Sequence, residues 1–342
     1  MFTFLRWTEQ AGRGWRILTD EQFLEYSRMR QAQPDQGGAG LARSSWNTEL
    51  SAVSAFYNAA VELGIVAKSP IRMRAARTTN RFGDLAKPGA LVPAGRKPQT
   101  KRKIKWLRLD QYTKFRDEGL RKLRFPERNA AFADFMLVTE ARRAEGSALR
   151  LSDVPELRDP KFEGKRTVKW SVPDEDAKGG EGRDSWISKL ALRRMIAYRD
   201  VERDVQMALA IEAGRYSKGP GAFWLNQNGE PMGMRGWNAV FAAAEEMCGV
   251  HCTPHMLRHT FAIYTLHNLV QIAMAEAAKS GVSHDYRKIT RDPCRELQRL
   301  MGHVDWSTTL IYLDYIGDLD GHTDDRLDYF DRRILLEADY GR

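Results

Sequence analysis

Hydrophobic residues recur at three- and four-residue intervals along much of the chain, a spacing that predicts amphipathic helices. The longest run near the N-terminus lies between Ser44, which we expect to cap the helix, and Gly64, which we expect to end it. Residues 15–21 look like a strand-like entry into a capped helix, which is predicted to run to about Gln33, where a proline follows. This part of the chain therefore predicts a small helical domain.

A strand pattern appears in the second half of the chain. Residues 166–172 alternate polar and apolar side chains, and residues 183–188 are predicted to return beside them as an antiparallel strand. Lys178 lies in the glycine-rich turn between the two strands. Helices are predicted around this hairpin, at residues 132–138, 189–213 and 236–247. The fold class that follows is mainly α with a small antiparallel β-sheet.

A basic segment rich in proline and glycine separates these two regions. Its prolines and glycines argue against regular structure, and its basic run contains no acidic residue. Such a linker is suited to crossing a phosphate backbone, although an ordinary solvated linker has the same composition. The residues that we expect to contact phosphate are Arg96, Lys97, Lys101, Arg102 and Lys103. The predicted division is a helical domain at 1–85, a linker at 86–103 and a second domain at 104–342.

The overall composition narrows the class of protein. A length of 342 residues with 42% hydrophobic residues is enough for one large domain or two. The net charge of +9 favours a polyanionic partner, although some ordinary enzymes are equally basic. Three cysteines argue against a disulfide framework, and no apolar run approaches the roughly 18–20 residues that span a bilayer. We therefore expect a cytoplasmic protein with no membrane partner.

Two candidate reactive residues share one helical face. Thr253 and Pro254 are predicted to be the cap and the first position of a helix, which places His255 and Arg258 three residues apart on one side. The imidazole can donate or accept a proton, and the guanidinium offers a planar set of donors that suits phosphate oxygens.

A histidine and a tyrosine follow near residue 310. Gly302 interrupts a helical pattern immediately before His303. The next short helix has an apolar face that begins at Trp306, and Tyr312 lies roughly 120° away from Trp306 around that helix. Tyr312 is therefore not simply another core residue of its helix.

In this order, the motifs resemble those of the tyrosine recombinase family, also called the phage-integrase family. The T-x-x-R-x-x-E segment looks like the family's first arginine box, and the K-G hairpin looks like its catalytic-lysine turn. The H-x-x-R box and the L-M-G-H box follow, with a tyrosine nine residues after the last histidine. The resemblance assigns catalytic roles to Arg142, Lys178, His255, Arg258, His303 and Tyr312, with Glu145 in support.

The resemblance also implies a mechanism. Tyr312 would attack DNA and form a covalent 3′-phosphotyrosine, with His255 as its base and Lys178 as the acid for the leaving oxygen. The two arginines would hold the phosphate, His303 would donate a hydrogen bond to it, and Glu145 would orient the cations. Strand exchange would pass through a Holliday junction, and no metal, ATP or other cofactor is expected.

The implied architecture has two domains that form a C-shaped clamp on duplex DNA attachment sites. By the same resemblance we expect a homotetramer on two DNA sites, with accessory DNA-bending factors as possible partners. The leading functional hypothesis is a site-specific recombinase of a mobile genetic element. The alternatives are a chromosome or plasmid dimer resolvase, an inactive DNA-binding relative, or a type IB topoisomerase.

Some assignments have rivals. Tyr315 competes with Tyr312 as the nucleophile, and Lys165 or Lys169 competes with Lys178. Four crowded residues have metal-ligand types, but we do not expect a metal there: Cys248, His251, Cys252 and His255. We assign no role to His259, His267, His284 and His322.

The chain departs from the family pattern at two places. Glu140 stands where the family usually has glycine, so the turn before Arg142 is expected to differ. About 45 residues separate Arg258 from His303, and residues 275–293 look like an insertion of unknown role.

Overall fold

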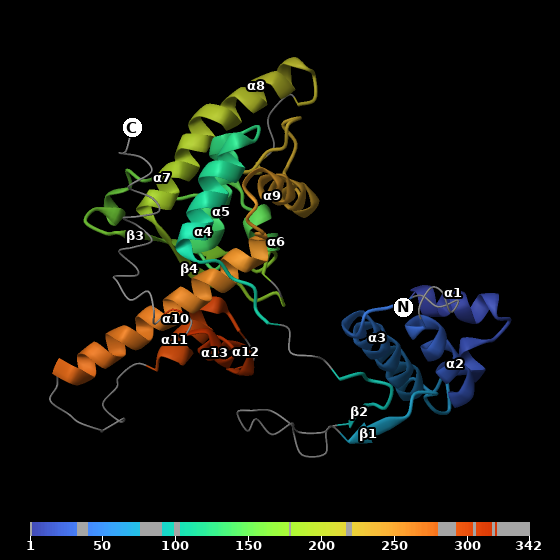
Figure 1. The fold of residues 1–342 in the computed structure, drawn as a ribbon. Coiled ribbons are helices and arrows are strands. Elements are labelled where there is room, and N and C mark those ends of the chain that lie inside the picture. Colours follow the sequence, from blue (N-terminus) through green and yellow to red (C-terminus); the bar gives the residue numbers. More distant parts are fainter. Residues whose placement is uncertain are drawn as a thin grey trace. The chain divides into compact units, whose positions relative to one another are not determined.

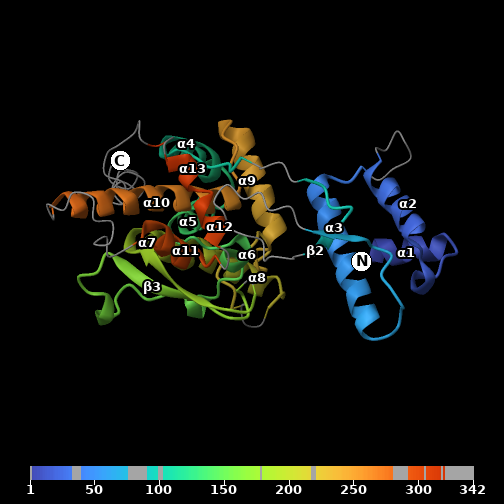
Figure 2. The same cartoon turned by 90° about the horizontal axis from the view of Figure 1, so that it is seen from below.

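The computed structural model of this chain is mainly helical, with two small antiparallel sheets (Figure 1). Figure 2 shows the same elements from below, turned by 90° about the horizontal axis. The described residues are 2–32, 40–75, 91–98, 103–177, 179–216, 221–279, 292–303, 306–316 and 319. These observations confirm the predicted fold class. Among the described helices, none combines the length and the hydrophobicity that a membrane span requires.

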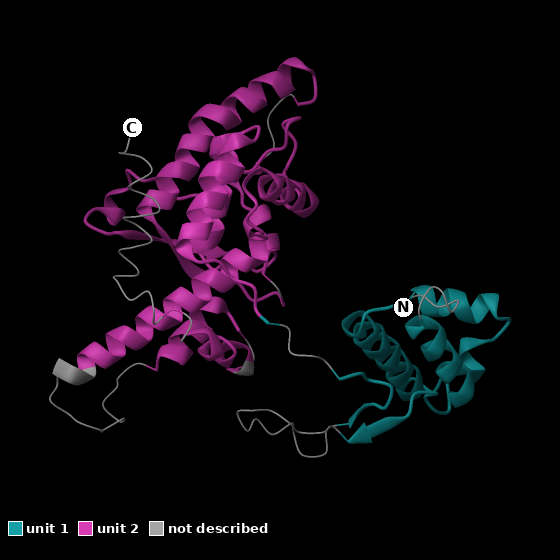
Figure 3. Ribbon diagram, viewed as in Figure 1, with its two compact units in different colours: residues 1–103 teal, residues 104–342 magenta. Residues whose placement is uncertain are grey.

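The chain divides into two compact units, residues 1–103 and 104–342 (Figure 3). Among its described residues, unit 1 contains three α-helices, a 3-10 turn at Trp15–Ile17 and a pair of short strands. Their bounds are α1 Phe2–Gln10, α2 Asp20–Gln31, α3 Arg43–Glu62, β1 Met73–Ala75 and β2 Leu91–Pro93. Its core is largely aromatic, with Phe4, Tyr26, Trp46 and Tyr57 all buried.

The ends of these helices test two predicted caps. Helix α2 is capped as expected, by Thr19 in a reciprocal capping box with Gln22, but residues 15–17 form a 3-10 turn and not the expected strand-like entry. The prediction for Ser44 is wrong, because α3 begins at Arg43 and the capping position is Ala42. Ser44 instead lies inside the first turn, where its backbone carbonyl accepts a hydrogen bond from the Thr48 hydroxyl.

Part of the segment expected as a linker belongs to unit 1. Leu91–Pro93 forms β2, which pairs antiparallel with β1 in the register Met73↔Pro93. The Trp46 indole donates to the carbonyl of Gly95, and the Asn47 side chain bonds the backbone of Lys97 in both directions. These long-range bonds hold the segment against α3, which its proline and glycine content does not reveal.

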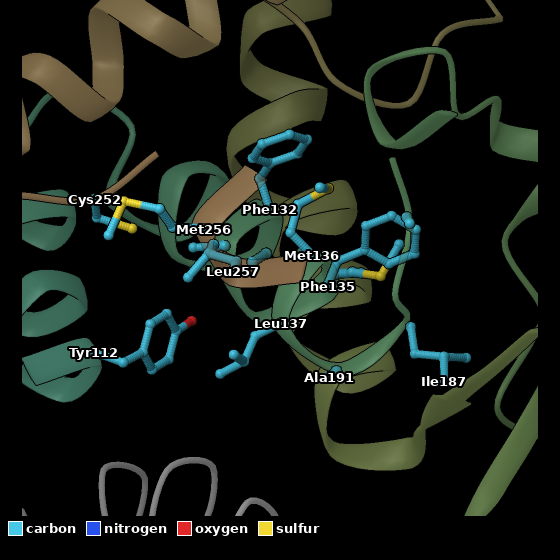
Figure 4. Packing of buried hydrophobic residues seen from close by; sticks show 14 of the residues in the cluster. Tyr112, Phe132, Phe135, Met136, Leu137, Ile187, Ala191, Cys252, Met256 and Leu257 are labelled. Atoms are coloured by element: carbon cyan, nitrogen blue, oxygen red, sulfur yellow. The ribbon is translucent and has the colours of Figure 1, made fainter. Parts of the chain in front are cut away.

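Unit 2 begins with helices around a buried central helix. The first elements are α4 Leu109–Lys114, a π turn at Phe115–Gly119, α5 Pro126–Val138 and α6 Arg143–Ser147. The helix α5 is buried along nearly all its length and packs against α7 Lys189–Tyr198 and α10 Pro254–Lys279. Phe132 of α5 stacks on Trp237 with ring centroids 3.5 Å apart, within the cluster that Figure 4 shows from close by.

The predicted hairpin is present in unit 2. β3 Thr167–Val172 and β4 Arg183–Ser188 pair antiparallel from Thr167↔Ser188 to Val172↔Arg183. Along β3 the side chains alternate between exposed and buried, which is the pattern that predicted the strand. The remaining helices are α8 Asp204–Glu212, α9 Met234–Cys248, α11 Pro293–Met301, α12 Trp306–Leu310 and α13 Leu313–Ile316.

Candidate active site

The N-terminal part of α10 carries a buried arginine. The Thr253 hydroxyl accepts the Met256 amide, so Thr253 caps α10 as the sequence predicts. Arg258 is only 3% exposed, and its guanidinium donates to the backbone carbonyls of Glu140 and Met301. Burial, together with the charges of Arg142 and Arg183, lowers the pKa of Arg258 to about 10. Arg258 therefore ties α10 to the turn before Arg142 and to the end of α11.

One carboxylate organises two further guanidinium groups. The Glu145 carboxylate accepts a hydrogen bond from the backbone amide of Arg142 at 2.7 Å and another from the Arg142 guanidinium at 2.8 Å. Both oxygens of Glu145 also accept from the Arg183 guanidinium, at 2.8 and 2.7 Å. Burial opposes ionisation of Glu145, but the bonds from Arg183 and Arg142 prevail and lower its pKa to about 2. The ionised carboxylate thus orients both cations.

Positive charge remains in excess in this cluster. Arg142 donates to the carbonyl of Gly302 at 2.9 Å, next to the Met301 carbonyl that Arg258 bonds. Three guanidinium groups therefore gather at the end of α11, while Glu145 forms the described ion pairs with two of them. Such a cluster suits a bound anion, and the fork geometry of arginine suits phosphate oxygens.

Tyr312 lies in the turn between α12 and α13, at the edge of this cluster. Its side chain is buried, with 2% exposure, and its hydroxyl is 2.9 Å from Nδ1 of His259. Its ring is nearly parallel to that of His303, with centroids 6.2 Å apart. Burial raises the pKa of Tyr312 to about 12, against the opposing charge of Arg258. The phenol is therefore neutral near pH 7.

Three histidines surround Tyr312 and Arg258. Nδ1 of His303 is 2.9 Å from the Thr309 hydroxyl, and burial with the charge of Arg258 lowers the His303 pKa to about 4. His255 is exposed at the start of α10, and its ring centroid is 4.3 Å from that of His259. Partial burial and Arg258 lower the pKa of His255, and burial with nearby positive groups lowers that of His259 to about 3. The rings of His259 and His303 are therefore neutral near pH 7.

The structure thus gathers most of the predicted site residues in unit 2. Arg142, Glu145, Arg258, His303 and Tyr312 share one network, and His255 joins it through its contact with His259. The sequence interpretation missed His259 and Arg183. His259 lies four residues after His255 on the same helix, and Arg183 is the arginine that closes the hairpin motif; these were the available signals.

Several predicted residues are not placed with the site. Lys178, Lys101 and Arg102 lie outside the described residues. Arg96 and Lys97 belong to unit 1, and Lys103 ends it. The rival Lys169 forms an ion pair with Asp184 at 2.7 Å on the exposed face of the hairpin. The rival Tyr315 accepts the Ile104 amide at 2.7 Å.

Glu140 occupies an unusual backbone conformation. Its φ of 48° lies in the left-handed region, which favours glycine, so the glycine-like turn persists here without a glycine. The side chain is 2% exposed, and its Oε1 atom has no hydrogen-bond partner. Burial raises the pKa of Glu140 to about 8, although Ser185 and nearby arginines oppose this shift.

The cysteines and histidines near residue 250 have other surroundings in the structure. His251 bonds Glu245 at 2.8 Å, and Cys248 and Cys252 are buried in the core. Within the described ranges, no three potential ligands from His, Cys, Asp and Glu are grouped to hold a metal ion.

Comparisons with known proteins show what this chain is similar to in sequence and in fold. No protein-family model matches the chain. A stretch of 93 residues is 34% identical to "Tyrosine recombinase XerC" of Pseudomonas putida (strain W619), and it spans 27% of this chain and 24% of that protein. The chain thus covers about a quarter of the length of the curated relative that it matches.

Two solved structures share the fold. The XerH site-specific recombinase bound to palindromic difH substrate, in a post-cleavage complex, has a TM-score of 0.54 at 14% identity, over 92% of this chain and 74% of that one. A Tn1549 transposon integrase in complex with a circular intermediate DNA has a TM-score of 0.50 at 16% identity, over 88% and 82% of the two chains. The chain therefore shares the fold of the XerH recombinase and the Tn1549 integrase, and one stretch of its sequence is similar to a tyrosine recombinase.

Proposed function

We propose that this protein is a site-specific recombinase that cuts and rejoins duplex DNA through Tyr312. The observation that carries the proposal is the position of the Tyr312 hydroxyl, within hydrogen-bonding distance of a histidine and in the field of Arg258. A nucleophile beside an excess of positive charge suits attack on a phosphodiester, whose transition state gains negative charge.

The proposed reaction proceeds by transesterification. The Tyr312 oxygen bonds to phosphorus while the bond from phosphorus to the 5′-oxygen breaks, which leaves a 3′-phosphotyrosine. Arg142 and Arg258 hold the non-bridging oxygens, and His303 donates a further hydrogen bond. Lys178 protonates the leaving 5′-oxygen. The covalent ester keeps the energy needed for rejoining, so the reaction as proposed uses neither ATP nor a metal.

The partners follow from the same proposal. The basic residues Arg96, Lys97, Lys101, Arg102 and Lys103 would contact the phosphate backbone, with the two units as a clamp on DNA. Exchange between two sites requires four active sites, so a homotetramer and a Holliday junction are proposed, with accessory DNA-bending factors if the sites need them. A mobile-element integrase is favoured, and a dimer resolvase is the second candidate.

The test is covalent capture of DNA by the protein. Nicked duplexes with random sequence on both sides of the nick are incubated with the wild type, Tyr312→Phe and Tyr315→Phe, and then resolved on a denaturing gel. We expect a protein–DNA band with the wild type and Tyr315→Phe that is absent with Tyr312→Phe. Sequencing of the captured DNA then identifies the preferred site.

Three outcomes would contradict the proposal. A band that survives Tyr312→Phe would assign the nucleophile to another residue. Specific DNA binding without any covalent band would favour a binding protein that lacks catalysis. Relaxation of supercoiled DNA without a preferred sequence would instead indicate a topoisomerase.

A further inference from the structure

The nearest described partner of the Tyr312 hydroxyl is a histidine that the sequence motifs leave without a role. Nδ1 of His259 lies 2.9 Å from the Tyr312 oxygen, a distance at which a general base can take a proton. The two residues are 53 positions apart in the chain, and their ring centroids are 5.8 Å apart. The contact therefore joins the face of α10 to the turn that carries the nucleophile.

We propose that His259, rather than His255, accepts the proton of Tyr312 when the tyrosine attacks phosphorus. This inference rests on the proposed function, because it takes Tyr312 as the nucleophile. His255 makes no hydrogen bond to Tyr312 among the described residues; it contacts the ring of His259 and is open to solvent. His255 is thus exposed on the surface, whereas His259 contacts the hydroxyl of the proposed nucleophile.

The charge state of the pair supports this direction of the hydrogen bond. Burial raises the pKa of Tyr312 to about 12 and, with His255, Arg258 and His303, lowers that of His259 to about 3. Both groups are then neutral near pH 7, so the phenol retains its proton and Nδ1 can accept the hydrogen bond.

The charged groups around His259 link the activation of Tyr312 to DNA binding. The positive charge of Arg258 is one cause of the low basicity of His259. A phosphate bound to the arginines offsets that charge and raises the basicity of His259. Without DNA the proton therefore stays on Tyr312, and with the scissile phosphate in place its transfer becomes more favourable.

The proposed step transfers one proton from Tyr312 to His259 and a second proton from Lys178 to the 5′-oxygen. As the bond from the Tyr312 oxygen to phosphorus forms, the phenolic proton moves to Nδ1 of His259. The 5′-oxygen leaves with the electron pair of its bond to phosphorus and receives a separate proton from Lys178. During rejoining the 5′-hydroxyl attacks phosphorus, and the departing phenolate recovers its proton from His259.

The first test requires no DNA. In protein labelled with ¹⁵N-histidine, the spectrum of His259, assigned by comparison with His259→Asn, reports which ring nitrogen carries the proton. We expect Nδ1 to be unprotonated and Nε2 protonated near pH 7. A proton on Nδ1 would make His259 the donor to Tyr312, which overturns the proposal.

The second test compares His259→Asn with two matched substitutions, His255→Asn and His251→Asn, on the DNA recovered by covalent capture. Asparagine keeps a polar group near the position of Nδ1 but cannot take a proton. We expect His259→Asn to slow formation of the covalent complex by about 10²-fold or more, with the dissociation constant for DNA changed less than about twofold. His251→Asn is the control, because His251 also uses Nδ1, in a bond to Glu245.

The pH dependence of the rate distinguishes the loss of a general base from a folding defect. Raising the pH should recover part of the lost rate in His259→Asn, because hydroxide can then remove the phenolic proton. Wild-type rates in His259→Asn, or recovery at high pH in His255→Asn alone, would refute the assignment. The proposed function itself fails only if Tyr312→Phe still forms the covalent complex or the wild type forms none.

Discussion

Arg258 shows how one residue connects the parts of this site. Its guanidinium is buried, and its donors reach two backbone carbonyls that lie 118 and 43 residues away in the chain. Arginine can serve both acceptors because its donors are spread over a rigid plane. Lysine has a single ammonium group and cannot reproduce that geometry.

We therefore expect Arg258→Lys to reduce covalent complex formation by about 10²–10³-fold. The matched control is Arg203→Lys, because Arg203 is also buried and donates to the carbonyls of Phe223 and Ala222 away from the site. Both variants should lower the melting temperature, and only Arg258→Lys should lower the single-turnover rate per folded molecule. Equal rate losses in both variants would contradict a role for Arg258 at the phosphate.

Two buried glutamates near Arg142 should respond to pH in opposite ways. The pKa of Glu140 is raised in the fold, to about 8, so its contribution to stability is retained below its unfolded pKa and lost as the pH rises towards 8. We expect Glu140→Gln to raise the melting temperature most above pH 8, with little difference from the wild type near pH 4. Thermal unfolding across this range measures the effect, and a pH-independent difference would contradict it.

The pKa of Glu145 is lowered in the fold, to about 2, because Arg183 and Arg142 outweigh its burial. Its contribution to stability is therefore present above its unfolded pKa and lost as the pH falls towards 2. We expect Glu145→Gln to destabilise the protein by roughly 3 kcal/mol near neutral pH, where a charged group loses its partner. Denaturant unfolding at pH 7 and at pH 3 should show the loss shrinking in acid.

At the scale of elements, the start of α10 positions the site. Thr253 satisfies the Met256 amide, and the residues that follow present His255, Arg258 and His259 from successive turns. The hairpin β3–β4 contributes Arg183 from the beginning of its second strand. The site thus depends on the relative positions of the N-terminal end of α10 and the beginning of β4.

Removal of the cap should weaken this arrangement measurably. We expect Thr253→Ala to cost about 1 kcal/mol of stability, because a helix amide loses its side-chain acceptor. Thr253→Ser keeps a hydroxyl and should restore most of the loss. Thr48→Ala is the control, since Thr48 lies inside α3 and bonds only a helix carbonyl. Urea unfolding midpoints compare the three, and equal midpoints for Thr253→Ala and the wild type would exclude the cap.

At the scale of the whole molecule, the two units have separate hydrophobic cores. Unit 1 packs an aromatic cluster around Trp46, and unit 2 packs its helices around α5. Each of the two described clusters draws its residues from one unit only. Each core is therefore able to stabilise its own unit.

We expect residues 104–342 to fold without residues 1–103. The isolated fragment should keep near-ultraviolet circular dichroism and unfold in one cooperative transition, because its core is intact. Loss of that signal with retained helix content would show that the second core depends on the first unit.

Local patterns in the sequence determined much of this protein. Alternation predicted β3 and β4, capping chemistry predicted the start of α10, and the order of motifs suggested the family resemblance and the candidate residues. Such features depend on near neighbours in the chain, whose spacing is read directly from the sequence. A cap without side-chain bonds, as at Ala42, leaves no such signal.

Only the tertiary structure determines which side chains and backbone groups contact one another. The partners of Tyr312, Glu145 and Arg258 include His259, Arg183 and the Glu140 carbonyl, which lie 53, 38 and 118 residues away from them. The four-residue spacing from His255 places His259 on the same helix, but it does not reveal the contact with Tyr312. The packing of α10 against the turn before Arg142 and the end of α11 sets these distances, and it also sets the burial that shifts the pKa values of the histidines and the tyrosine.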